Sequence, residues 1–163
     1  MAKNKEEKTN VMRVLEQKKI AYTAHTYPHE EGVAVDGVTV AQSMGFDPAI
    51  VFKTLVARGA SKQYYVFDVP VAENLDLKKA AKAVGEKSIE MIHQKELLPL
   101  TGYVHGGCSP VGMKKLFPTV FHETAENLET MIVSAGKIGY QVELAPHDLA
   151  ALVRAKFADI IVE

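Results

Sequence analysis

The 163-residue sequence has few cysteines, little net charge and no long apolar run, and each shortage excludes a class of protein. Cys108 is the only cysteine, so no intramolecular disulfide can form, which agrees with a reducing cytoplasm. The formal net charge of −1 excludes the broad positive field that drives non-specific DNA binding, but allows a local basic pocket for an RNA end. No apolar run approaches the roughly 20 residues of a membrane-spanning helix, and the polar first residues lack the apolar core of a secretory signal. We therefore expect a cytoplasmic protein with no DNA or membrane partner.

The residues that are present describe an ordinary globular chain. Hydrophobic residues make up 47% and charged residues 24%, proportions typical of soluble domains. The length suits a single domain over residues 1–163, with residues 1–8 as a flexible N-terminus.

Apolar periodicity and capping residues predict helices and strands along most of the chain. Helices are predicted at 10–19, 39–44, 75–85, 93–100, 124–131 and 146–155. The predicted strands include 20–28, the hairpin 51–58 with 63–70, the hairpin 131–136 with 140–145, and a final strand at 158–162. This order favours an α+β fold: a mixed, largely antiparallel sheet of six to seven strands that closes toward a barrel, flanked by helices.

The segment GYVHGGCSPVG at 102–112 holds four glycines in eleven positions. Two consecutive glycines, Gly106 and Gly107, can turn their N–H groups toward one point and bind an anion or a developing oxyanion. Ser109 adds a hydroxyl group and Pro110 stiffens the exit. The alternative is a tight turn that binds no ligand.

Lys53 interrupts an apolar strand, AIVFKTLVA, whose two faces are otherwise mostly apolar. Its ammonium group must therefore reach solvent at a sheet edge or point into a polar cavity. At an edge it would protect the sheet from aggregation. In a cavity it could hold a phosphate or an oxyanion.

Cysteine and histidine offer two further chemistries. Cys108, with His105 three residues away, could act as a thiol nucleophile, or it could simply fill a small apolar space. His25 and His29 flank Tyr27, and two nearby histidines suggest a metal site as one possibility. The usual zinc-ligand spacings are absent from the sequence, so we predict no metal site.

Several stretches together resemble the YbaK/ProX family of trans-editing aminoacyl-tRNA deacylases, most closely its YbaK-type branch. They are HTYPHE, FKTLVA, NLDLKKAAKAVGEKSIEM, TGYVHGGCSPVGMKK, VSAGKIGYQVELAPHDL and ADIIVE, in the family's order, and they cover nearly the whole chain after about residue 12. The resemblance implies a mixed β-barrel with flanking helices. It also implies a site in which Lys53 of the F-K-T-L motif is the residue most closely tied to activity. The other implied site residues are Gly106 and Gly107 with the lysine, and Tyr27, Thr54, Ser109, Pro110 and Ser134 around the substrate.

The resemblance further implies a reaction that needs no cofactor and no protein nucleophile. In the YbaK-type reaction the thiol of the substrate, Cys-tRNA(Pro), attacks its own ester, so the protein needs no acid–base pair. The implied partners are the aminoacyl-tRNA 3′ end and, transiently, prolyl-tRNA synthetase. Cys108 stands where the relatives carry a small aliphatic residue, which favours a filling role for it. An Ala-tRNA(Pro) deacylase that uses water and a non-catalytic tRNA- or synthetase-binding module remain the alternatives.

Overall fold

The computed structural model describes residues 8–163. The predicted flexible N-terminus at 1–8 therefore lies outside the described residues except for Lys8, whose ammonium group forms an ion pair with Glu16 at 2.9 Å. None of the helices within 8–163 is both long enough and apolar enough to cross a membrane.

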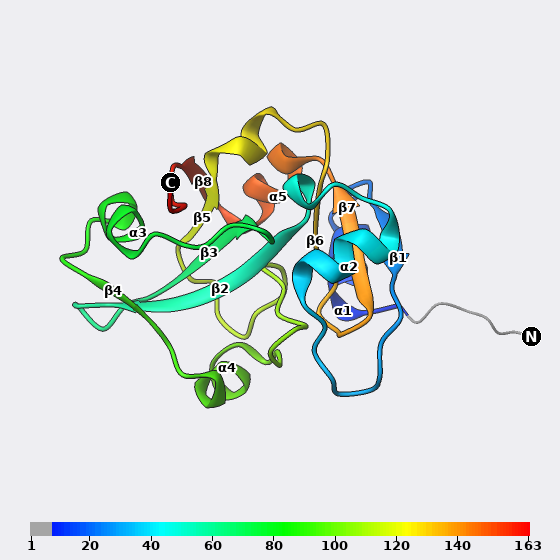
Figure 1. Cartoon of the computed structure of the whole chain (residues 1–163), viewed down its shortest axis with the longest axis horizontal. Coiled ribbons are helices and arrows are strands. Elements are labelled where there is room, and N and C mark those ends of the chain that lie inside the picture. The colour runs from blue at the N-terminus through cyan, green and yellow to red at the C-terminus, as the bar shows by residue number, and fades with distance from the viewer. Residues whose placement is uncertain (1–7) are drawn as a thin grey trace, which may run out of the picture.

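Within residues 8–163 eight strands form two sheets (Figure 1). The smaller sheet is antiparallel, in the order β1-β7-β6. The larger sheet has the order β4-β2-β3-β5-β8, in which β3-β5 and β5-β8 are parallel and the other pairs are antiparallel. The bounds are β1 Thr23–Thr26, β2 Phe52–Gly59, β3 Tyr64–Pro70, β4 Ile89–Met91, β5 Thr119–His122, β6 Met131–Ser134, β7 Tyr140–Leu144 and β8 Ala155–Ala158.

The prediction of a mixed, largely antiparallel α+β fold is confirmed. The strands divide between two sheets, however, and within 8–163 they do not close into one barrel. An isolated parallel bridge between Val51 and Ile132 connects β2 of the larger sheet to β6 of the smaller one. The start of β2 therefore lies at the junction of the two sheets.

Several helices begin or end at capping residues that the sequence supplies. Their bounds are α1 Asn10–Gln17, α2 Gly37–Met44, α3 Leu77–Val84, α4 Gln94–Thr101 and α5 Pro146–Val153, with short 3-10 helices at Pro48–Ile50 and Glu123–Asn127. The side chains of Thr9, Asp36 and Asp76 accept N–H groups at the starts of α1, α2 and α3. Gly45 and Gly85 end α2 and α3 in the left-handed conformation.

Three predicted elements differ from the structure. The helix expected at 124–131 is the five-residue 3-10 helix at 123–127. The final strand expected at 158–162 is wrong in position. Helix α5 ends at Val153, Arg154 follows it in the left-handed conformation (φ 59°), and the chain pairs with β5 from Ala155 onward. The strand expected at 20–28 narrows to 23–26, the four residues that pair with β7.

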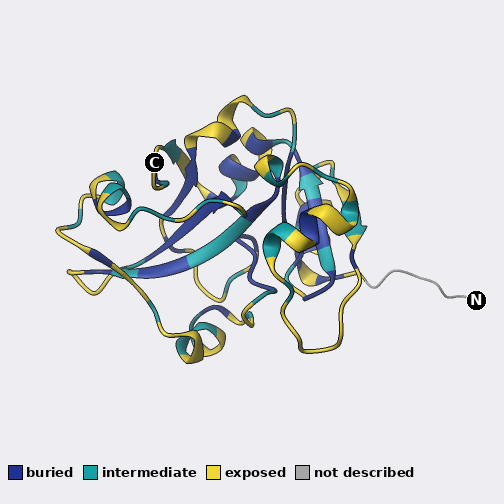
Figure 2. Cartoon of the chain, viewed as in Figure 1, coloured by how far each residue is buried: buried dark blue, intermediate teal, exposed yellow. Residues whose placement is uncertain are grey.

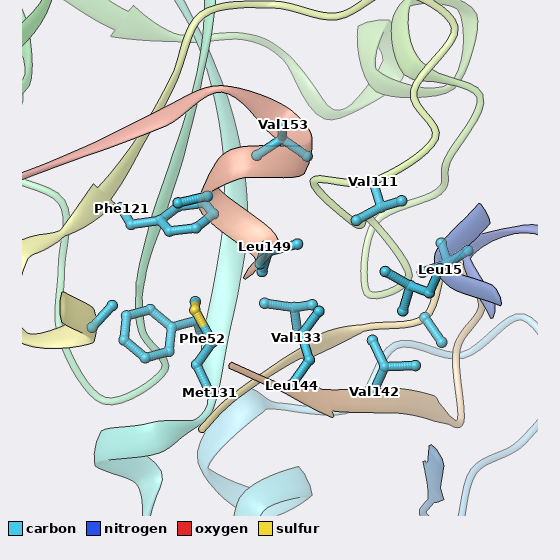
Figure 3. Close-up of a cluster of buried hydrophobic side chains, with 14 of the residues drawn as sticks. Leu15, Phe52, Val111, Phe121, Met131, Val133, Val142, Leu144, Leu149 and Val153 are labelled. Atoms are coloured by element: carbon cyan, nitrogen blue, oxygen red, sulfur yellow. The ribbon is translucent and has the colours of Figure 1, made fainter. Parts of the chain in front are cut away.

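Strands of both sheets are buried over much of their length (Figure 2), and the main core contains side chains from both sheets (Figure 3). Phe52 of β2 and Phe121 of β5 come from the larger sheet, and Val133 and Leu144 come from the smaller one. Leu149 of α5 packs among them and is fully buried. This packing holds the start of β2 firmly against the smaller sheet, and that junction is where the candidate site lies.

Candidate active site

A cavity of about 370 Å³ opens where the start of β2 meets the smaller sheet. Its walls come from β2, from the chain around the start of α2, from the ends of β6 and β7, and from the glycine-rich loop between α4 and β5. Five of the predicted site residues line it together: Tyr27, Lys53, Thr54, Gly106 and Ser134. The structure thus brings to one place residues that are up to 107 positions apart in the chain.

Lys53 lies in the cavity wall, half-buried, rather than reaching solvent at a sheet edge. Burial lowers the pKa of its ammonium group, while the charges of Asp36 and Glu73 act in the opposite direction. Asp36 is the N-cap of α2 and lines the same cavity. A partly desolvated ammonium group in such a pocket interacts strongly with a phosphate or an oxyanion.

The glycine-rich loop contributes its backbone through Gly106. This residue has φ 90°, and a Cβ at this position would lie 2.7 Å from Cβ of Ala34. Only glycine combines this conformation with so close an approach. The N–H of Gly107 donates to the carbonyl oxygen of Val104 at 3.0 Å, so the predicted pair of free N–H groups is wrong for Gly107.

The other predicted site residues of the loop, Gly107, Ser109 and Pro110, do not line the cavity. Gly107 packs on the turn after β6, where a Cβ would lie 3.1 Å from the backbone nitrogen of Ile138. The two glycine-bearing turns therefore face each other. Ser109 is fully buried, and its hydroxyl oxygen accepts the N–H of Val111 at 3.2 Å. Pro110 is buried beside it.

The smaller sheet supplies the opposite wall. Ser134 ends β6 and accepts the N–H of Gly136 through its hydroxyl oxygen at 3.0 Å. Tyr27 is buried, and its N–H donates to the carbonyl oxygen of Gly139 at 3.0 Å. Gln141 pairs in register with Ser134 and lines the cavity, and its side-chain oxygen has no hydrogen-bond partner within 8–163. Sequence reasoning missed Gln141, because it falls on the polar face of an ordinary alternating strand, YQVEL, and so gives no signal of a site.

His25 and His29, the two histidines that suggested a metal site, contact other groups of the protein. The Nε2 atom of His25 lies 2.8 Å from Oε1 of Glu143, and the Nδ1 atom of His29 lies 3.0 Å from the carbonyl oxygen of Tyr27. Within 8–163 no group of three or more potential metal ligands comes together.

Cys108 lines the cavity but is poorly suited to be a nucleophile. Burial and the charge of Asp68 raise the pKa of its thiol to about 12, so the thiol stays protonated near pH 7. His105 lines the same cavity yet is exposed. The side chain of Cys108 packs with Val56, Val66 and other apolar residues, which agrees with the filling role expected from the sequence.

Asp68 is a second residue that sequence reasoning missed. It lies on β3 directly opposite Thr54 of β2, is fully buried, and accepts a hydrogen bond from the Thr54 hydroxyl at 2.5 Å. Burial raises the pKa of its carboxyl group to about 7, although the Thr54 hydrogen bond lowers it. The signal in the sequence is one acidic residue inside the otherwise apolar strand YYVFDVP.

Known proteins resemble this chain in sequence and in fold. The profile of the aminoacyl-tRNA editing domain matches residues 32–152. EbsC of Enterococcus faecalis (strain ATCC 700802 / V583), provisionally named a Cys-tRNA(Pro)/Cys-tRNA(Cys) deacylase, is 46% identical over 161 residues, or 98% of each chain. A solved structure provisionally described as a trans-editing enzyme for prolyl-tRNA synthetase is 26% identical, with a TM-score of 0.79 over 94% of this chain and 95% of that one. The hypothetical protein APE2540 shares the fold, with a TM-score of 0.82 at 18% identity over 93% of this chain and 99% of that one.

Proposed function

The chain belongs to the aminoacyl-tRNA editing domain family, and from that premise we propose that it removes cysteine from Cys-tRNA(Pro) in trans. The family resemblance inferred from the sequence motifs is confirmed, and with it the assignment as an aminoacyl-tRNA deacylase. The choice of cysteine and of the proline tRNA is supported by the name of the relative that is 46% identical over 98% of both chains. The context of prolyl-tRNA synthetase is supported by the description of the 26% identical structure.

One observation carries the proposal at the level of the site. Lys53, the Gly106 backbone, Tyr27, Thr54 and Ser134 line one cavity of about 370 Å³, a size typical of small-ligand sites. The only thiol of the protein is held protonated beside them, because burial raises the pKa of Cys108 to about 12. Such a site can orient an ester and stabilise an oxyanion, but it lacks an activated cysteine nucleophile.

In the proposed reaction the cysteinyl ester enters the cavity with its carbonyl group between Lys53 and the backbone at Gly106. The thiol of the substrate attacks its own ester carbon, and the carbonyl oxygen gains negative charge. Lys53 stabilises that charge or a phosphate of the terminal nucleotide. The ester C–O bond then breaks, which gives a cyclic thiolactone and a tRNA with a free terminal ribose hydroxyl group. Holding one substrate in this geometry is effective because the attack is intramolecular.

The test is deacylation of Cys-tRNA(Pro) and Ala-tRNA(Pro) by the purified protein. We expect rapid loss of the cysteinyl ester alone. We expect Lys53→Ala to slow that loss by about 10²- to 10³-fold, as removal of an oxyanion-stabilising group does elsewhere. Lys82→Ala, which removes an exposed lysine from α3, is the matched control and should act like the wild type.

Each other result has a defined meaning. Preference for the alanyl ester would replace the thiol-assisted reaction with attack by water. Full protection of Cys-tRNA(Pro) by prior alkylation of its thiol is expected, and hydrolysis of the alkylated substrate would contradict the proposal. No loss of either ester would leave a tRNA- or synthetase-binding module.

A further inference from the structure

Asp68 stands out because it is a fully buried carboxyl group in an apolar strand. Its chain neighbours Phe67 and Val69 are also fully buried. β3 is an interior strand of the larger sheet, paired with β2 on one side and β5 on the other. An acidic side chain is rarely placed in such surroundings, because burying its charge is costly.

The carboxyl group of Asp68 has a single hydrogen-bond partner within 8–163. Oδ1 accepts the Thr54 hydroxyl at 2.5 Å, whereas the buried Oδ2 accepts no hydrogen bond from any described residue. Thr54 itself lines the cavity. Asp68 is thus separated from the cavity by one hydroxyl group, which can donate and accept a proton at the same time.

Two titratable groups are linked electrostatically to Asp68, Cys108 directly and Tyr103 through Cys108. Burial and Asp68 raise the pKa of Cys108 to about 12, and burial and Cys108 raise the pKa of Tyr103 to about 12. Both are therefore neutral at pH 7. From β5 the residue in register with Asp68 is the apolar Phe121. Lys53, next to Thr54 on β2, places its charge in the cavity.

We propose that Asp68, acting through the hydroxyl group of Thr54, accepts the proton of the substrate thiol when that thiol attacks the ester. This step rests on the proposed function. The thiol proton passes to Thr54 Oγ1 as the Thr54 proton passes to Asp68 Oδ1, and the sulfur forms its bond to the ester carbon. When the ester C–O bond breaks, the electron pair leaves on the ribose oxygen, and the proton returns to that oxygen by the same route. Thr54 contacts the substrate, and Asp68 is a positioning residue behind it.

The match between the groups supports this route. A free cysteine thiol has a pKa of roughly 8.5, and burial raises the pKa of Asp68 to about 7. Proton transfer is efficient between groups whose pKa values lie close to one another and to the working pH. The resemblance to the family implied a site without an acid–base pair, whereas the structure places Thr54 in its wall and Asp68 directly behind Thr54.

The experiment measures single-turnover deacylation of Cys-tRNA(Pro) from pH 5.5 to 9 for the wild type, Asp68→Asn, Thr54→Val and Thr54→Ser. The wild-type rate should rise through an apparent pKa near 7 and then level off. Asp68→Asn and Thr54→Val should be at least 10-fold slower at pH 7, and their rates should keep rising to about pH 8.5, where the free thiol ionises. Thr54→Ser, which keeps the hydroxyl group, should retain the rate within about 3-fold and keep the wild-type pH profile.

An Asp68→Asn protein with the wild-type rate and pH profile would overturn the proton route and leave the deacylase function intact. A Thr54→Ser protein as slow as Thr54→Val would overturn it as well. A wild-type protein that leaves Cys-tRNA(Pro) intact at every pH would instead overturn the proposed function. A separate titration of the carboxyl carbon of Asp68 by NMR needs no substrate, and an Asp68 that stays protonated up to pH 9 could not accept the thiol proton and would contradict the proton route by itself.

Discussion

Replacement of Asp68 by asparagine should change how the stability of the protein depends on pH. The variant keeps the shape of the side chain and an oxygen that accepts the Thr54 hydroxyl. The amide nitrogen of the asparagine takes the position of Oδ2, where it remains buried without a hydrogen-bond partner within 8–163. This costs about 1–3 kcal/mol, and the cost does not vary with pH. The pH-dependent part of the difference therefore reports the ionisation of Asp68 alone.

The magnitude follows from the pKa of Asp68 in the folded protein. Burial raises it from 3.8 to about 7, which corresponds to about 4 kcal/mol at high pH. The unfolded chain releases this proton first, so the stabilising contribution is complete below pH 3.8 and is lost as the pH rises through 7. About 2.5 kcal/mol of that loss falls between pH 5 and pH 8.

Urea unfolding at pH 5 and pH 8 measures this effect. We subtract the free energy of unfolding of the wild type from that of Asp68→Asn. This difference should be about 2.5 kcal/mol higher at pH 8 than at pH 5, because only the wild type loses stability over this range. Glu129→Gln removes an exposed carboxyl group, and its difference from the wild type should stay within about 0.5 kcal/mol at both values. A change of less than about 1 kcal/mol for Asp68→Asn would refute the argument that burial holds this carboxyl group partly protonated.

Three further substitutions test the site. Cys108→Ala should keep the rate of Cys-tRNA(Pro) deacylation within about 3-fold, because burial raises the pKa of that thiol to about 12. A loss of rate of about 100-fold would instead support Cys108 as the nucleophile. Lys53→Met should slow deacylation by about 10²- to 10³-fold, as Lys53→Ala does. It should leave the melting temperature unchanged or higher, since burial lowers the pKa of Lys53 and its charge therefore opposes folding; a clear drop in melting temperature would contradict this interpretation. Gly106→Ala should lower the free energy of unfolding by about 1–3 kcal/mol, because the residue has φ 90° and the added Cβ would lie 2.7 Å from Cβ of Ala34; equal stability in urea would contradict the close approach.

Much of the local structure could be predicted from the sequence. The capping side chains of Thr9 and Asp76 and the terminal glycines Gly45 and Gly85 mark helix ends, because those residue types satisfy or relax the free backbone groups there. Lys53 likewise indicates a cavity or a sheet edge through its apolar chain neighbours alone. Such features depend on residues that are close together in the chain.

The errors arose where partners distant in the chain decide the outcome. The final strand begins at Ala155 because β5, more than 30 residues away, offers a parallel edge there. The N–H of Gly107 donates to the carbonyl oxygen of Val104 in a turn that the composition of the loop does not predict. The strands separate into two sheets because a core packs between them, with Phe52 on one side and Val133 on the other.

The sequence by itself determined the class of fold, several of the helix ends and the family, because each depends on the residue types present and on their order. Only the tertiary structure decided which of those residues share a cavity. It joined Lys53 and Gly106 to the smaller sheet, removed Ser109 and Pro110 from the cavity wall, and placed Asp68 behind Thr54. The physical reason is that burial and long-range pairing set the pKa of a carboxyl group and the direction of a backbone donor, and neither is a property of a residue and its chain neighbours alone.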